Sequence, residues 1–300
     1  MAIPAIAPYS MPLASALPKN RVLWHVHPQR AVLLIHDMQQ YFLNAYVPGE
    51  SPLMELLANI RLLKNQCAAM GIPVVYTVQP GALTPEDRGL LQDFWGPGLA
   101  DEPGQTKVAD GVMPGENDTV LTKWRYSAFK RTQLREFMHQ RGRDQLIIGG
   151  VYAHIGCLLT AGDAFMQDLE PFLIGDAVAD FSAEHHRMAL QYAADNCAVV
   201  TGTTLLLQEL KRNQQSTEKA VPEGSAQQFT LQLMRQHVAE LLGESGADID
   251  DNEDLIDRGL DSIRMMSLVE QWRSMGVEAT FIKLAKKPTI SGWWELLAPK

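Results

Sequence analysis

The chain of 300 residues has room for one large domain or two unequal ones. Its 46% apolar and 20% charged residues are typical of a globular protein, and no run approaches the roughly 20 apolar residues of a membrane span. The net charge of −9 argues against nucleic acid or an anionic membrane as the main partner.

The cysteines and the N-terminus indicate the compartment. Cys67, Cys157 and Cys197 lack the spacing of a metal site, so we interpret them as free thiols in a reducing environment. The first residues show no charged segment followed by a long apolar run, which a signal peptide would require. We therefore expect a cytoplasmic protein.

Residues 1–211 alternate between strand and helix patterns after an arm, 1–30, that is rich in proline and alanine and predicted to extend over the surface. The predicted strands are 31–35, 73–78, 119–122, 145–151, 171–174 and 198–201, and the predicted helices include 52–71, 157–169, 183–194 and 203–211. Continuously apolar strands indicate a sheet covered on both faces. The pattern predicts an α/β domain with a mostly parallel sheet and helices on both faces.

The C-terminal part changes character after a polar segment without periodicity, 212–225, which we interpret as a linker. No strand pattern occurs in 226–300, so this segment is predicted to be a small helical bundle. Its first helix has a stripe of Leu231, Met234, Val238 and Leu241, and its second begins near Ser262 with Ile263, Met266, Val269 and Trp272 on the apolar side. A short segment at 281–284 and a helix from about residue 289 complete it.

Polar side chains and a glycine-containing turn follow successive predicted strands. Asp37 follows the first strand, Gln79 the second and Lys123 the third, and Tyr152 begins the turn after the fourth. Ligands of parallel sheets bind beyond the carboxyl ends of the strands. Any one of these residues alone fits a helix cap or a surface position, whereas their succession along the chain favours a functional site.

Three motifs carry a family resemblance: IHDMQ (35–39), TKWRYSAF (122–129) and GVYAHIGC (150–157). In this order and spacing they resemble the isochorismatase-like hydrolase superfamily over about residues 15–211. Cysteine hydrolases of that superfamily use an Asp, a Lys and a Cys nucleophile. Asp37 and Lys123 match the first two, but Gly156 occupies the nucleophile position, as in the isochorismatase branch.

The resemblance implies hydrolysis of the enolpyruvyl ether of isochorismate to 2,3-dihydro-2,3-dihydroxybenzoate and pyruvate, without a covalent intermediate. It implies that Asp37 is the general acid and that Lys123 holds a substrate carboxylate and orients Asp37. The amide of Gly156 would contact the enolpyruvyl group. Lys123 would favour the ionised carboxylate and burial the protonated one, and the sequence leaves open which effect prevails.

The expected substrate-binding residues surround these three. Gln79 would position water or the pyruvyl carboxylate, and Arg88 would clamp a carboxylate with its planar fork. Tyr152 would bind the enolpyruvyl group, and Phe42 and Trp95 would form walls for the ring.

Two other functions fit the sequence less well. An amide hydrolase would need Cys157 as nucleophile, but Cys157 lies one residue beyond the nucleophile position of the superfamily. At a strand-to-helix turn this shift points the side chain in a different direction, so we interpret Cys157 as a packing residue. A catalytically inactive α/β domain that supports only the C-terminal segment is the second alternative, against which the intact Asp37 and Lys123 argue.

The remaining polar clusters do not predict a metal site. The histidine pairs 25/27 and 185/186 have no matching carboxylate motif, so we expect them at the surface or in packing contacts and expect no metal. Asp176 and Asp180 are predicted to cap the loop and helix after the fifth strand.

The motif Gly259-Leu260-Asp261-Ser262 lies where an acidic segment meets the second helix of the C-terminal bundle. Alone it fits an ordinary helix cap. Within a helical segment of this length it resembles carrier domains, in which the serine of a G-x-D-S motif bears 4′-phosphopantetheine. The resemblance implies that Ser262 is the attachment point.

Both resemblances, in this order, are similar to the bifunctional isochorismatase and aryl carrier proteins of catecholate siderophore biosynthesis. They imply a carrier that receives 2,3-dihydroxybenzoate as a thioester. They also imply three partner enzymes: a phosphopantetheinyl transferase, an aryl-adenylating ligase and a condensation-domain synthetase of nonribosomal peptide synthesis. Family members self-associate through the hydrolase domain, so a homodimer is expected.

Overall fold

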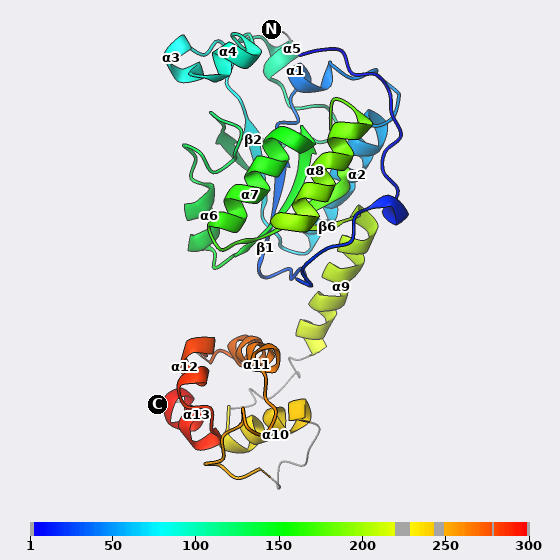
Figure 1. Ribbon diagram of the computed structural model, residues 1–300. Coiled ribbons are helices and arrows are strands. Elements are labelled where there is room, and N and C mark those ends of the chain that lie inside the picture. The colour runs from blue at the N-terminus through cyan, green and yellow to red at the C-terminus, as the bar shows by residue number, and fades with distance from the viewer. Residues whose placement is uncertain (1–2, 220–228, 243–248, 278, 299–300) are drawn as a thin grey trace. The chain divides into compact units, whose positions relative to one another are not determined.

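The computed structural model describes residues 3–219, 229–242, 249–277 and 279–298 (Figure 1). The chain divides into two compact units, Met1–Ala220 and Val221–Lys300. No helix in the described part of the chain is both long and apolar enough to cross a membrane.

A six-stranded sheet in the order β3-β2-β1-β4-β5-β6 forms the centre of the first unit, and every strand pair is parallel. The strands are β1 Ala31–His36, β2 Val74–Val78, β3 Thr119–Thr122, β4 Gln145–Val151, β5 Glu170–Ala179 and β6 Val199–Thr201. The predicted α/β fold is confirmed. The strand order reverses between β1 and β4, and ligands of such sheets bind at this switch point.

Helices cover both faces of the sheet because its strands are apolar on both sides (Figure 1). One layer contains α2 (Leu53–Ala69) and α9 (Thr203–Lys219), and the other contains α6 (Leu134–Gln140), α7 (Leu158–Met166) and α8 (Ala183–Asn196). The shorter elements are η1 Ala14–Ala16, α1 Gln40–Leu43, α3 Pro85–Arg88, α4 Leu91–Trp95, α5 Pro103–Thr106 and the π-helix η2 Ala153–Cys157.

Most residues of the N-terminal arm are exposed or half-buried, as expected of an arm over the surface, but a few of its apolar side chains enter the core. Ile6, Met11 and Val26 are buried in the core, and Ile6 pairs with Tyr46 in an isolated bridge. Apolar side chains scattered among prolines show no period, yet they fill gaps beside the sheet. The arm is therefore part of the packed unit.

Two element ends also differ from prediction. Helix α9 continues to Lys219, so residues 212–219 of the expected linker are helical. This stretch contains several good helix formers, which can prolong an existing helix by a turn or two without an apolar face. Strand β5 continues to Ala179, so Asp176 lies inside it, where its Oδ1 accepts hydrogen bonds from the amide and hydroxyl of Thr203 and caps α9 instead of the next helix.

The regular secondary structure in the described residues of the second unit is helical, as predicted. Its helices are α10 Leu231–Leu242, α11 Ser262–Ser274, α12 Phe281–Lys286 and α13 Ile290–Leu297. Their core includes Met234, Val238, Leu268, Trp272 and Trp293. Met266, which we placed on the apolar side of α11, is 47% exposed. Met265 is buried in its place, because Met265, Leu268, Val269 and Trp272 share one helical face.

Gly150, near the end of β4, allows β1 and β4 to approach closely at the switch point. Its φ is +120°, and a Cβ there would lie 2.1 Å from the carbonyl oxygen of His36. We predict that Gly150→Ala lowers the free energy of unfolding by more than about 3 kcal/mol. Gly142→Ala is the matched control: its φ is also positive, at +61°, but a Cβ there meets nothing within 4 Å.

The expected cost of Gly142→Ala is only about 1 kcal/mol, from backbone strain alone. Urea unfolding of the two variants measures the difference. Equal costs would show that the approach of the two strands does not require glycine.

Candidate active site

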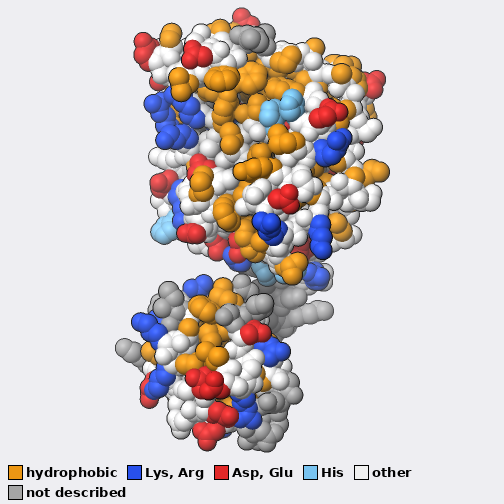
Figure 2. Space-filling view, in the orientation of Figure 1, with side chains coloured by type: hydrophobic (Ala, Val, Ile, Leu, Met, Phe, Trp, Pro, Cys, Tyr) orange, Lys and Arg blue, Asp and Glu red, His pale blue; other side chains and the backbone are white. Residues whose placement is uncertain are grey.

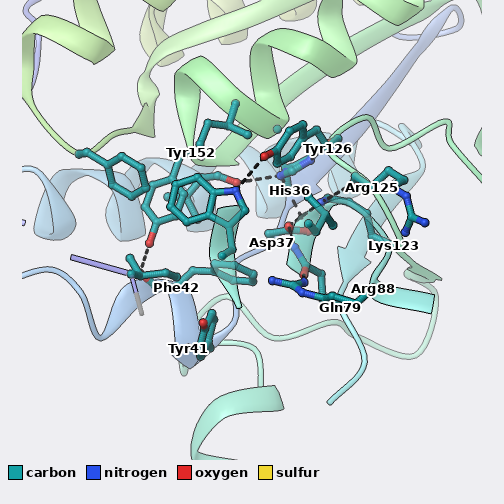
Figure 3. Close-up of a pocket in the computed structure, with 17 residues that line it drawn as sticks. His36, Asp37, Tyr41, Phe42, Gln79, Arg88, Lys123, Arg125, Tyr126 and Tyr152 are labelled. Atoms are coloured by element: carbon teal, nitrogen blue, oxygen red, sulfur yellow. Dashed lines mark hydrogen bonds and ion pairs between the residues drawn. The ribbon is translucent and has the colours of Figure 1, made fainter. Parts of the chain in front are cut away.

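A pocket lies beyond the carboxyl ends of β1, β2 and β4 (Figure 3). The structure brings together in it all eight residues that we expected in the hydrolase site: Asp37, Phe42, Gln79, Arg88, Trp95, Lys123, Tyr152 and Gly156. Their chemical roles stay predictions. The sequence analysis missed other lining residues, among them Ile3, His36, Tyr41, Arg125, Tyr126 and Phe181.

A buried ion pair forms the polar floor of this pocket (Figure 3). Lys123 Nζ lies 2.8 Å from Asp37 Oδ2, and the side chains are 3% and 4% exposed. Lys123 also donates to the carbonyl of Arg125, at 2.8 Å. The other carboxylate oxygen, Oδ1, accepts a hydrogen bond of 2.7 Å from the hydroxyl of Thr77.

Asp37 adopts a conformation that side-chain-bearing residues seldom take. Its φ is +50°, in the left-handed region, directly after β1. Such strain costs about 1–3 kcal/mol and persists only where neighbouring contacts hold the residue in place. Here the amide of Asp37 donates to the carbonyl and hydroxyl of Thr77, and Gln79 Nε2 donates to Oδ2 at 2.9 Å. The carboxylate is thus fixed in direction.

The structure answers the charge question that the sequence left open. Burial on its own would raise the pKa of Asp37, but the charge of Lys123, with hydrogen bonds from Lys123 and Gln79, outweighs it and holds the pKa below its ordinary value. Asp37 is therefore ionised in the empty pocket at neutral pH.

Arg88 supplies a second buried positive charge. It is 4% exposed, its Nε donates to the carbonyl of Gly96, and its Nη1 lies 3.3 Å from Gln79 Oε1. Among the described residues no carboxylate lies within ion-pair distance of its guanidinium, and burial lowers its pKa. A buried cation whose partners are neutral oxygens favours an anionic ligand.

Aromatic side chains form the walls of the pocket. The Tyr152 and Phe181 ring centroids lie 4.3 Å apart, and Phe42 meets Tyr152 edge to face at 6.1 Å. The hydroxyl of Tyr152 donates to the carbonyl of Phe42, at 2.7 Å, so it is not free to bind the substrate as we expected. Trp95 Nε1 donates to the hydroxyl of Tyr126, at 2.7 Å, which fixes the indole over the pocket.

Cys157 does not have the properties of a nucleophile. Its side chain is fully buried and is not among the residues that line the pocket. Burial, together with the negative charges of Asp37 and Asp180, raises the pKa of its thiol well above the ordinary value. A thiol in this environment stays protonated, which argues against the amide hydrolase.

One group of potential metal ligands occurs in the described part of the chain: His154, Asp180 and His185, whose ligand atoms lie within 4.8 Å of one another. The carboxylate of Asp180 already accepts hydrogen bonds from the amide of His154, the amide of Phe181 and the ring of His154. Asp180 therefore caps the turn after β4 and, through the Phe181 amide, the loop after β5 as we predicted, whereas the helix after β5 is capped by Ser182.

In the second unit, Ser262 is the first residue of α11. The side chain of Asp261 caps this helix by accepting a hydrogen bond of 2.8 Å from the amide of Arg264. Asp261 and Arg264 are exposed on either side of the serine. A helix N-terminus fits a phosphodiester, because free amides and the helix dipole favour negative charge there.

Residues 31–204 match the family described as "Isochorismatase domain". The chain belongs to the isochorismatase family. Residues 232–297 match "Phosphopantetheine attachment site", which places this second domain on the helical unit. The crystal structure of a cysteine hydrolase from Pseudomonas syringae pv. phaseolicola 1448A has the fold of the first unit, with a TM-score of 0.58 and 22% identity over 65% of this chain and 98% of that one.

Relatives of this isochorismatase-family chain cover one or both units. The isochorismatase of Bacillus subtilis is 57% identical over 100% of this chain and 96% of its own length. Enterobactin synthase component B of Escherichia coli K12 is 47% identical over 99% of both chains. Phenazine biosynthesis protein PhzD of Pseudomonas fluorescens is 50% identical over 67% of this chain and 96% of its own.

The buried ion pair predicts coupled stability effects. Lys123→Met leaves the Asp37 carboxylate buried without its cation, and we expect a loss of about 3–5 kcal/mol in the free energy of unfolding. In an Asp37→Asn background the same change should cost much less, because no charge is left unpaired. A double-mutant cycle by urea unfolding measures the coupling. Additive losses would contradict an ion pair between these residues.

Proposed function

We propose that the chain hydrolyses isochorismate to 2,3-dihydro-2,3-dihydroxybenzoate and pyruvate, and carries 2,3-dihydroxybenzoate as a phosphopantetheine thioester on Ser262 for siderophore assembly. The main support is the pocket itself: a buried, fixed carboxylate lies beside a lysine, and a glycine stands where a nucleophile would be. The 57% identity to an isochorismatase over the whole chain points to the same reaction.

The chemistry needs a proton donor and water, and no covalent intermediate. Asp37 protonates the terminal methylene of the enolpyruvyl group, which gives an oxocarbenium ion. Water adds to the oxocarbenium carbon, which bears the ether oxygen, and returns a proton to the Asp37 carboxylate. The hemiketal collapses when its hydroxyl proton passes to the ether oxygen that joins it to the ring and the bond between that oxygen and the hemiketal carbon breaks, which releases pyruvate and the dihydrodiol. General acid catalysis of this kind contributes about 10²–10⁴ in rate.

The ionised state of Asp37 in the empty pocket has to change before this step. Isochorismate carries two carboxylates, and the pocket offers two buried cations, Lys123 and Arg88. A substrate carboxylate beside Lys123 partly neutralises the lysine and places a like charge near Asp37. Both effects raise the pKa of Asp37. Substrate binding therefore takes up the proton that catalysis uses.

Lys123, Gln79 and the Gly156 amide fit the reacting end of the substrate, and Arg88 fits a carboxylate. Phe42 and Trp95 fit the walls around the ring. Tyr152 contributes its ring face, since its hydroxyl is engaged with the backbone. No step in this proposal requires a metal.

The carrier reaction places 4′-phosphopantetheine on Ser262, where its phosphate would lie at the N-terminus of α11 and its thiol would hold the acyl group. A phosphopantetheinyl transferase attaches the arm, an aryl-adenylating ligase loads it and a condensation-domain synthetase unloads it. The exposed apolar side chains of Ile256 and Met266, on either side of Ser262 in sequence, are suited to contacts with such partners. We place these reactions in the cytoplasm, where the three buried thiols stay reduced.

We also propose a homodimer through the hydrolase unit. Hydrophobic side chains lie over the face of this unit that α7 and α8 form in the view of Figure 2. The large apolar residues exposed on these two helices are Leu159, Phe165, Met166, Met188 and Tyr192. An exposed set of this kind is typical of an interaction surface.

The hydrolase proposal predicts pyruvate release from isochorismate that depends on the Asp37 proton. Asp37→Asn keeps the size of the side chain but cannot act as an acid, so the rate should fall about 10²–10⁴-fold. A coupled lactate dehydrogenase assay follows pyruvate. Wild-type protein that is folded and releases none would leave the α/β unit as an inactive support for the carrier domain.

The carrier proposal predicts one modification site that is independent of hydrolysis. With coenzyme A and a phosphopantetheinyl transferase, the wild-type chain should gain the mass of a single arm, and Ser262→Ala should gain none. Intact-protein mass spectrometry measures the gain. The variant should release pyruvate at the wild-type rate, because Ser262 is not in the hydrolase unit. An arm on the Ser262→Ala chain would place the attachment elsewhere, with Ser267 on the same helix as the first residue to test.

A further inference from the structure

The ring of His36 fills the space beside Gly156. A Cβ built on Gly156 would lie 2.1 Å from Cε1 of His36, 2.7 Å from Nε2 and 2.9 Å from Nδ1. These atoms belong to a rigid ring, so no flexible end can bend away. The φ of Gly156 is not in the left-handed region, and the backbone alone would accept a side chain there. The neighbouring ring is what requires glycine.

One hydrogen bond and close packing hold this ring in place. His36 is 1% exposed, its Nδ1 lies 2.8 Å from the carbonyl oxygen of Val151, and its Nε2 lies 3.3 Å from that of Tyr126. Burial lowers the pKa of His36, so the ring is neutral and has one N–H. The shorter contact assigns this hydrogen to Nδ1.

The ring therefore links the ends of β1 and β4 and packs against the loop after β3. His36 precedes Asp37 at the end of β1, Val151 ends β4 before Tyr152, and Tyr126 lies in the loop after β3 that also supplies Lys123. Through its hydrogen bond to Val151 the imidazole ties the residue before Asp37 to the turn that contains Gly156, and it also contacts the loop that supplies Lys123 (Figure 3).

We infer that His36 is a positioning residue that sets the place of Asp37 and of the turn after β4, and that a histidine at 36 and any side chain at 156 exclude each other. A cysteine nucleophile at 156 could enter this pocket only if His36 were replaced by a residue without a ring. The pair His36 and Gly156 thereby restricts the site to chemistry without a covalent intermediate. The inference deepens the proposed hydrolase function and rests on it for its kinetic test.

The mutual exclusion is tested by thermal unfolding of the full chain. Gly156→Ala should lower the Tm markedly, whereas Gly162→Ala, in α7, should not, because a Cβ there meets nothing within 4 Å. In a His36→Ala background the fall caused by Gly156→Ala should shrink to less than half. An equal fall in both backgrounds would overturn the exclusion. This result does not depend on which substrate the protein uses.

The positioning role is tested by two replacements of similar size. His36→Leu cannot donate to the Val151 carbonyl, whereas the amide of His36→Asn can. We expect His36→Leu to lower kcat about 10²-fold, because a displacement of about 1 Å costs that much. KM for isochorismate should change little, because Arg88, the proposed partner of a substrate carboxylate, forms no hydrogen bond with the His36 ring. His36→Asn should recover part of kcat.

Wild-type kcat in a folded His36→Leu variant would overturn the positioning role, as would equal loss in the Leu and Asn variants. If the wild-type chain releases no pyruvate, the proposed function fails, while the thermal cycle still decides the exclusion of His36 and a side chain at 156.

Discussion

The ion pair between Asp37 and Lys123 is the interaction on which the rest of the hydrolase site depends. Both charges are almost fully buried, and either one alone would be costly in that position. They come from the ends of β1 and β3, which are separated by β2 in the sheet. Thr77 and Gln79, from the intervening strand and the residue beyond it, supply the hydrogen bonds that keep the carboxylate oriented. The parallel order of these strands therefore builds the site.

The same ion pair sets a requirement on the ligand. Because Lys123 keeps the Asp37 carboxylate ionised, Asp37 cannot donate a proton until a further charge in the pocket raises its pKa. In the proposed reaction a dianionic substrate would do so through its own charge, and the buried Arg88 would give its second carboxylate a partner. Substrate recognition and activation of the acid thus share one electrostatic cause, and a neutral analogue would gain neither.

Much of this arrangement could be predicted from the sequence, because apolar runs mark parallel strands and the residues that follow them meet at one edge. Asp37, Gln79 and Lys123 follow from this rule alone. His36 escaped notice because it lies between Ile35, where the predicted strand ended, and Asp37, the polar residue that drew attention, and only the packing shows that Gly156 faces its ring. The path of the N-terminal arm was also unpredictable, because its buried side chains have no period and its position is set by distant contacts.

In the proposed mechanism Asp37 is ionised before the substrate binds and protonated in the substrate complex. Carbon-13 NMR of aspartate-labelled protein tests it directly, with Asp37→Asn to assign the signal and an unreactive isochorismate analogue whose vinyl ether is reduced to a lactyl ether. Near neutral pH the account predicts a carboxylate signal without ligand and a carboxylic acid signal with it. A carboxylate signal in both states would contradict Asp37 as the proton donor.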